Sequence, residues 1–140
     1  MSKVAIVYWS GTGNTQIMAD AVAEGAKAAG AEVSVFGPAE FGSGKVAEFD
    51  SIAFGCPAMG AEVLEETEYE PMFTDVETAI SGKRVGLFGS YGWGDGQWMR
   101  DWEERCNAVG ARLVADGVMA NYAPTGEVLE ECKALGRALA

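Results

Sequence analysis

The sequence predicts an α/β fold, a doubly wound five-stranded parallel sheet with helices on both faces, and three observations lead to that prediction. Five apolar segments of strand length alternate with segments of helical length along the 140 residues. The apolar segments are continuous, as is typical of parallel strands buried on both faces. Right-handed crossovers between such strands place helices on both sides of the sheet. From its length, we expect residues 1–140 to form one domain.

The first half of the chain shows the alternation clearly. Ile17, Met18 and Val22 share one face of the first expected helix, and Gly30 can end that helix. Residues 37–49 are rich in Gly, Pro and Ser and are expected to be irregular, with one helical turn at most. Each apolar run here predicts a strand. The elements expected in this half are strands at residues 4–8, 32–36 and 51–56 and a helix at residues 14–29.

The second half continues the pattern. Val85, Leu87 and Phe88 form the apolar centre of the fourth expected strand. Trp98 and Trp102 give the helix that follows it large side chains for packing. The elements expected in this half are strands at residues 84–89 and 112–119, a helix within residues 69–80, and helices at residues 97–109 and 127–139.

The composition excludes several classes of function. A formal net charge of -11 opposes binding to nucleic acid and to anionic membranes, since both need a cationic surface. Without histidine, Ser–His and Cys–His catalysis are excluded, and three widely spaced cysteines indicate neither a disulfide framework nor a metal site. No apolar run is long enough to cross a bilayer, and the first residues lack a signal-peptide pattern, so we expect a cytoplasmic protein.

Acidic residues are concentrated in the middle of the chain, where no Lys or Arg lies between Lys45 and Lys83. One interpretation is a solvated surface that keeps the protein soluble. The other is a docking face for basic proteins, which opposite charge would attract. The acidic residues of this stretch are Glu48, Asp50, Glu62, Glu65, Glu66, Glu68, Glu70, Asp75 and Glu77.

The segment after the first strand, S-G-T-G-N-T at residues 10–15, has the character of a phosphate site. Its glycines allow backbone amides to approach an anion, and the helix that follows favours negative charge at its start. It is not a dinucleotide fingerprint, which would need glycine in place of Gln16, and no Gly-Lys-Ser/Thr follows to make a P-loop. We therefore expect a phosphomonoester held by neutral donors; a capped strand-to-helix turn is the alternative.

The loops after the third and fourth strands, residues 56–62 and 90–96, should meet the first loop at the carboxyl edge of the sheet. Trp93 stands between glycines on a bare loop and is suited to stack on a planar ligand. Met59 is a polarizable side chain suited to the other face of such a ligand. Each has a simpler interpretation: Met59 in the core, and Trp93 folded onto its own domain.

These three loops together resemble the FMN-binding loops of flavodoxins in order and spacing. The resemblance extends through the whole chain and is greatest to short-chain flavodoxins of anaerobic bacteria, of clostridial type. It implies a flavodoxin-like sheet with strand order 2-1-3-4-5 and flavin mononucleotide (FMN) as cofactor.

The resemblance also implies a role for each loop. The phosphate would be held by Ser10, Thr12, Asn14 and Thr15 with the loop amides, including those of Gly11 and Gly13, and with Trp9 beside them. Ala58 and Ser90 would lie near the ribityl chain, and Met59 and Trp93 would enclose the flavin ring. Glu62 would bond the flavin N3–H, and the segment Tyr91, Gly92 and Gly94 would meet the pyrimidine oxygens. The Gly60 carbonyl would turn toward flavin N5 on reduction, a motion that glycine permits.

The function that the resemblance implies is low-potential, one-electron transfer through oxidised, semiquinone and hydroquinone FMN, without catalysis on a small molecule. Larger redox proteins would dock basic patches on the acidic face at the flavin edge, and the protein is expected to be a monomer. One alternative is an FMN-dependent quinone or NAD(P)H reductase on the same fold. Another is a binding module for a phosphorylated ligand without redox function.

Overall fold

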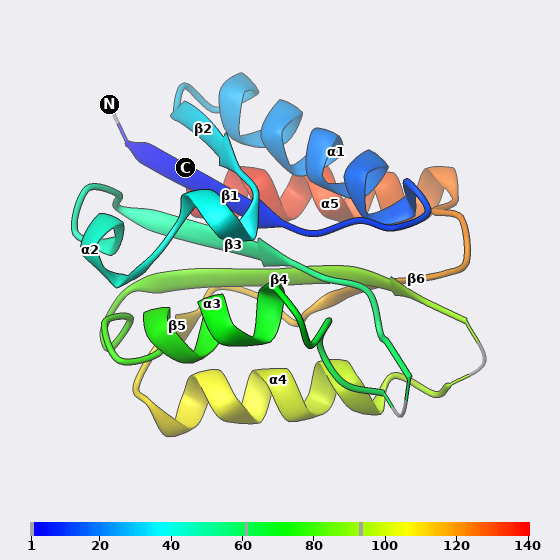
Figure 1. The fold of residues 1–140 in the computed structure, drawn as a ribbon. Coiled ribbons are helices and arrows are strands. Elements are labelled where there is room, and N and C mark those ends of the chain that lie inside the picture. The colour runs from blue at the N-terminus through cyan, green and yellow to red at the C-terminus, as the bar shows by residue number, and fades with distance from the viewer. Residues whose placement is uncertain (1, 61, 93) are drawn as a thin grey trace.

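The computed structural model describes residues 2–60, 62–92 and 94–140 as three layers, with a sheet between two pairs of helices (Figure 1). Helices α1 and α5 cover one face of the sheet, and α3 and α4 cover the other. The strands are β1 (Lys3–Tyr8), β2 (Glu32–Phe36), β3 (Ser51–Gly55), β4 (Arg84–Tyr91), β5 (Arg112–Leu113) and β6 (Val118–Asn121). The helices are α1 (Asn14–Ala28), the 3-10 helix η1 (Pro38–Glu40), α2 (Ser43–Val46), α3 (Tyr69–Val76), α4 (Gln97–Ala108) and α5 (Gly126–Leu139).

The sheet has the strand order β2-β1-β3-β4-β5, and every described pair of neighbouring strands is parallel. The predicted fold class and strand order are thereby confirmed. The chain moves outward from β1 in both directions, so β1 and β3 flank the point where the strand order reverses.

The prediction of one continuous strand over residues 112–119 is wrong. β5 pairs with the start of β4, and β6 pairs with its end. The Val114 N–H still donates to the Val85 carbonyl at 3.0 Å, and residues 115–117 leave the ladder. At the break the N–H of Gly117 donates to Glu103 Oε2 of α4 at 2.7 Å. Asp and Gly are disfavoured in strands, so the side chain of a neighbouring helix replaces a strand as hydrogen-bond partner here.

β4 is longer than the sequence predicts, because it continues through Ser90 and Tyr91 instead of ending at residue 89. These two residues pair with Ala120 and Asn121 of β6. Ser90 and Tyr91 are therefore held at the end of a strand, whereas we expected them on a loop.

The core lies on both faces of the sheet, as the continuous apolar strands predict. Ala5 and Val7 of β1 pack toward α3 and α4, and Val4 and Ile6 pack toward α1 and α5. Backbone atoms of α1 and α5 come very close, since a Cβ added to Gly136 would lie 2.1 Å from the Val22 carbonyl oxygen. None of the helices in the described part of the chain is long and apolar enough to span a membrane.

The segments that follow β1, β3, β4 and β6 gather at one end of the sheet, on the right in Figure 1. Parallel strands end at the same edge, so this arrangement brings together residues that lie more than a hundred positions apart in the sequence.

Candidate functional site

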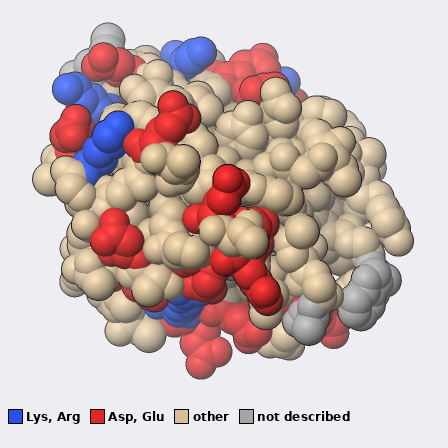
Figure 2. Space-filling model, viewed as in Figure 1, with Lys and Arg blue, Asp and Glu red and all other residues tan. Residues whose placement is uncertain are grey.

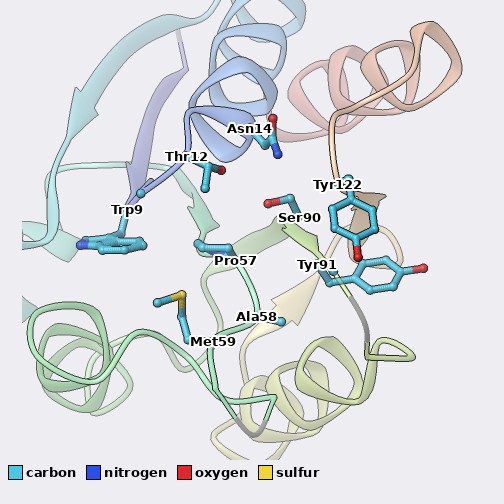
Figure 3. Close-up of a pocket in the computed structure, with 11 residues that line it drawn as sticks. Trp9, Thr12, Asn14, Pro57, Ala58, Met59, Ser90, Tyr91 and Tyr122 are labelled. Atoms are coloured by element: carbon cyan, nitrogen blue, oxygen red, sulfur yellow. The ribbon is translucent and has the colours of Figure 1, made fainter.

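A cavity of about 270 Å³ lies at this carboxyl edge of the sheet (Figure 3). Four separate segments of the chain contribute to its walls, and in this view Trp9 stands on one side and Tyr122 on the other. It is lined by Trp9, Gly11, Thr12, Asn14, Pro57, Ala58, Met59, Ser90, Tyr91, Gly92 and Tyr122.

The first predicted loop forms an anion-binding start to α1. Gly13 precedes the helix with a φ of 97°, a conformation that favours glycine, and its N–H donates to Ser10 Oγ at 3.0 Å. In the described part of the chain α1 has no side-chain cap, so its first amides keep their donors for a ligand. Ser10 and Gly13 shape this turn without lining the cavity.

Thr15 lies behind the cavity wall and contacts Ser90, which lines the cavity. Its side chain is buried, and its hydroxyl lies 3.3 Å from that of Ser90 at the end of β4. This contact ties the first loop to the third. Thr15 is outside the cavity lining, and Ser90 is within it.

The second predicted loop is a tight reversal closed by two hydrogen bonds between Met59 and Val63, with N–O distances of 2.8 and 3.0 Å. Gly60 has a φ of 50°, and Glu62 has a φ of 56°, which is uncommon for a residue other than glycine. Such backbone strain is typical of ligand-binding segments. Ala58 joins this loop to β4, because its N–H donates to the Ser90 carbonyl at 3.0 Å.

Glu62 links the second and third loops. Its Oε1 accepts the N–H of Gly96 at 3.2 Å, and a Cβ on Gly94 would lie 2.1 Å from the same oxygen. Gly94 therefore allows the carboxylate to lie against the backbone of the third loop. Glu62, Gly60 and Gly94 are outside the cavity lining, so the structure places them beside the cavity rather than around it.

The third predicted loop begins from a well-anchored strand end. The Tyr91 ring packs on Trp98 of α4 with 5.5 Å between centroids, and Trp98 Nε1 donates to the Cys56 carbonyl at 3.2 Å. Trp93, which we expect to enclose the flavin ring opposite Met59, lies outside the described residues. Its stacking role stays a prediction.

Pro57 and Tyr122 also line the cavity, and neither is among the site residues expected from the sequence. Tyr122 follows β6, has a φ of 60° and is 62% exposed. Its N–H donates to the Tyr91 carbonyl at 2.7 Å, and Asn121 Nδ2 donates to the Gly92 carbonyl at 2.9 Å. The sequence does offer one signal for Tyr122: it directly follows the last strand, and that strand must end at the same edge of the sheet as the others.

The acidic residues between 62 and 77 have separate structural roles. Arg105 of α4 binds Glu70 at 2.6 Å and Glu77 at 2.9 Å, and this pairing lowers the pKa of Glu70. Glu65 is buried, and Asp75 binds the backbone and hydroxyl of Ser43. Acidic side chains still gather in the centre and lower half of the face in Figure 2, over α3 and the segment before it.

The described residues favour neither a nucleophilic cysteine nor a metal site. Burial raises the pKa of the Cys56 thiol to about 12, so this thiol next to the cavity stays protonated at neutral pH. Within residues 2–60, 62–92 and 94–140, no group of three or more acidic or cysteine side chains is placed to hold a metal ion.

Comparison with known proteins identifies the family. A family model described as flavodoxin matches residues 6–136. The chain is 47% identical over 140 residues to a flavodoxin of Megasphaera elsdenii, with 98% of each chain covered. The chain belongs to the flavodoxin family. Another flavodoxin, from Clostridium beijerinckii, is 45% identical over 135 residues, which cover 96% of this chain and 97% of that one.

The fold agrees with those of solved flavodoxins. The solution structure of two-electron reduced Megasphaera elsdenii flavodoxin matches with a TM-score of 0.86 and 47% identity over 97% of each chain. Flavodoxins hold FMN, transfer electrons to redox partner proteins, and are not catalysts acting on small molecules. The predicted family, cofactor and electron-carrier function are thus confirmed, and the reductase alternative is not favoured.

The residues around the cavity fit FMN. An uncapped helix start with neutral hydroxyls suits a phosphate group, and the apolar walls at Trp9, Met59 and Tyr122 suit a planar ring. The lining residues include no Lys or Arg. Neutral donors of this kind suit a single phosphate, whereas a triphosphate site would have a lysine.

Proposed function

We propose that this cavity holds one FMN, with the phosphate at the start of α1 and the ring toward Met59, and that the protein is a cytoplasmic monomer. The observation that carries the proposal is the uncapped start of α1, which opens onto the cavity beside Trp9 and Met59. Thr12 and Asn14 face the same space from this helix start (Figure 3). The amides and the helix dipole together replace the cation that phosphate sites often use.

Bound FMN supplies electron transfer in two one-electron steps, and we propose that their potentials are well separated. The chain contributes by charge: its net charge of -11 opposes the addition of a further negative charge in the site. Gly60 contributes by conformation. Its φ of 50° is a conformation that favours glycine, and we propose that the absence of a side chain lets the Gly60 carbonyl turn when FMN is reduced.

The phosphate cradle leads to a test of the proposal. We expect the chain freed of FMN to bind FMN about a hundredfold more tightly than riboflavin, because two or more charge-assisted hydrogen bonds go to the phosphate. Thr12→Val should weaken FMN binding about fivefold and leave riboflavin binding unchanged, since only the hydroxyl is lost. Fluorescence titration measures both constants.

The same preparation tests the redox proposal. Stepwise reduction of the loaded protein should show two separate one-electron steps in the visible spectrum. Equal affinity for FMN and riboflavin would contradict the phosphate cradle, and direct two-electron reduction would contradict the separation of potentials. A colourless protein that does not bind added FMN would instead support the alternative of a non-redox binding module.

We further propose that redox partners dock basic patches on the acidic face beside the cavity. Glu68 borders this face and bonds Trp9 of the cavity wall, with 3.1 Å between Trp9 Nε1 and Glu68 Oε2. Glu66 is exposed, whereas Glu70 and Glu77 are already paired with Arg105. Because one Arg105 neutralises only one of these two carboxylates, the docking charge is somewhat smaller than the sequence suggests, and Glu68 ties part of it to the cavity wall.

Salt dependence tests this docking. The rate constant for electron transfer to a basic haem protein should fall about tenfold as ionic strength rises from about 0.01 M to about 0.15 M, because salt screens the attraction. With ferricyanide, a small anionic acceptor, the rate should instead rise with salt. Stopped-flow absorbance follows both reactions. A rate that is independent of salt with the basic acceptor would argue against an acidic docking face.

A further inference from the structure

Glu65 is a buried carboxylate, 6% exposed, in the segment between the second loop and α3, and it lines neither of the cavities beside it. It accepts hydrogen bonds from the backbone N–H groups of Thr67 at 2.9 Å, Glu68 at 2.8 Å and Tyr69 at 2.9 Å, and from the Thr67 hydroxyl. Its own N–H donates to Cys56 Sγ at 3.4 Å, directly after β3. One side chain thus organises the whole turn that leads into α3.

The turn presents Glu68 to the cavity wall. Glu68 Oε2 accepts the indole N–H of Trp9 at 3.1 Å, across 59 positions of sequence. The far edge of the same indole lies against the first loop, because a Cβ on Gly11 would be 3.0 Å from Trp9 Cη2. The Trp9 ring is therefore held between the Gly11 backbone and the Glu68 carboxylate.

We propose that Glu65 is a positioning residue of the cofactor site: by holding the 65–69 turn, it keeps Glu68 in place to orient Trp9 on the wall of the cavity. Glu65 acts through Glu68 and touches no ligand itself. The consequence for FMN affinity rests on the proposed function, whereas the consequence for Trp9 does not. In Glu65→Gln one acceptor oxygen becomes an NH2 donor and the other loses its charge, so the three buried or half-buried N–H groups lose part of their hydrogen bonding and the turn must rearrange.

The first readout is the indole N–H resonance of Trp9 in the ¹⁵N-labelled chain without FMN, assigned by its absence in Trp9→Phe. We expect Glu65→Gln to shift this resonance and to raise the Kd for FMN about fivefold or more. Glu66→Gln is the matched control: it makes the same change of charge one position away, on an exposed side chain. It should leave the resonance in place and the Kd within about twofold.

Two more variants separate position from charge. Glu65→Asp keeps the charge but shortens the side chain, so it should behave as Glu65→Gln does. Glu68→Gln keeps an acceptor for Trp9 and should resemble the wild type, whereas Glu68→Ala should reproduce the shift. The proposal is overturned if Glu65→Gln and Glu65→Asp leave the Trp9 resonance unmoved. A wild-type chain that does not bind FMN would instead refute the proposed function.

Discussion

Gly136→Ala is expected to lower the free energy of unfolding by about 2 kcal/mol or more, which corresponds to a fall in melting temperature of about 6 °C. The added Cβ would lie 2.1 Å from the Val22 carbonyl oxygen and 2.7 Å from the Ala26 nitrogen. Both are backbone atoms of α1, so relief requires α1 and α5 to separate. The loss should exceed the gain of up to about 1 kcal/mol that alanine brings to a helix.

Gly126 provides a control in the same helix. It is the first residue of α5, and a Cβ there would meet nothing within 4 Å. Gly126→Ala should therefore leave stability unchanged or raise it by up to about 1 kcal/mol. Chemical denaturation followed by circular dichroism compares the two variants. Equal stabilities would show that α1 and α5 do not pack as closely as the structure indicates.

Glu65→Gln is expected to lower the free energy of unfolding by about 3 kcal/mol at pH 7 relative to the wild type, and this difference should shrink as the pH falls. Burial alone would raise the pKa of Glu65, but the Thr67 hydroxyl and three backbone N–H groups outweigh it and lower the pKa from 4.5 to about 2. A carboxylate with a lowered pKa in the folded state contributes stability above pH 4.5. That contribution is lost as the pH falls through about 2.

The comparison works because glutamine has nearly the shape of the protonated acid. At pH 7 the wild type has a charged acceptor for its four donors. Near pH 2, at its pKa, Glu65 is about half protonated, so the wild type approaches the neutral acceptor that the variant has throughout. Glu66→Gln, on an exposed side chain, should differ from wild type by less than about 0.5 kcal/mol. Denaturant melts at a series of pH values give the differences. A Glu65 difference that stays constant down to pH 2 would contradict the lowered pKa.

Much of the molecule was predictable because local pattern and global fold agree. Continuous apolar runs identify strands buried on both faces, and the S-G-T-G-N-T segment indicates a phosphate site before any contact is known. The break at Gly117 escaped prediction because its partner, Glu103, lies 14 positions away on a helix. Pro57 and Tyr122 escaped for a similar reason, since only the folded chain shows that they meet the first loop around one cavity.

The sequence by itself determined the class of fold, the three loops, the net acidity and the kind of ligand, because each depends on residue types at short spacing. The tertiary structure decided which of those residues meet around one cavity and which stand behind it. It also decided that, of one acidic stretch, Glu65 is buried in a turn, Glu70 is paired with Arg105 and Glu66 is exposed. Burial and partners across long sequence separations set the role of a charge, and neither can be read from the residues next to it.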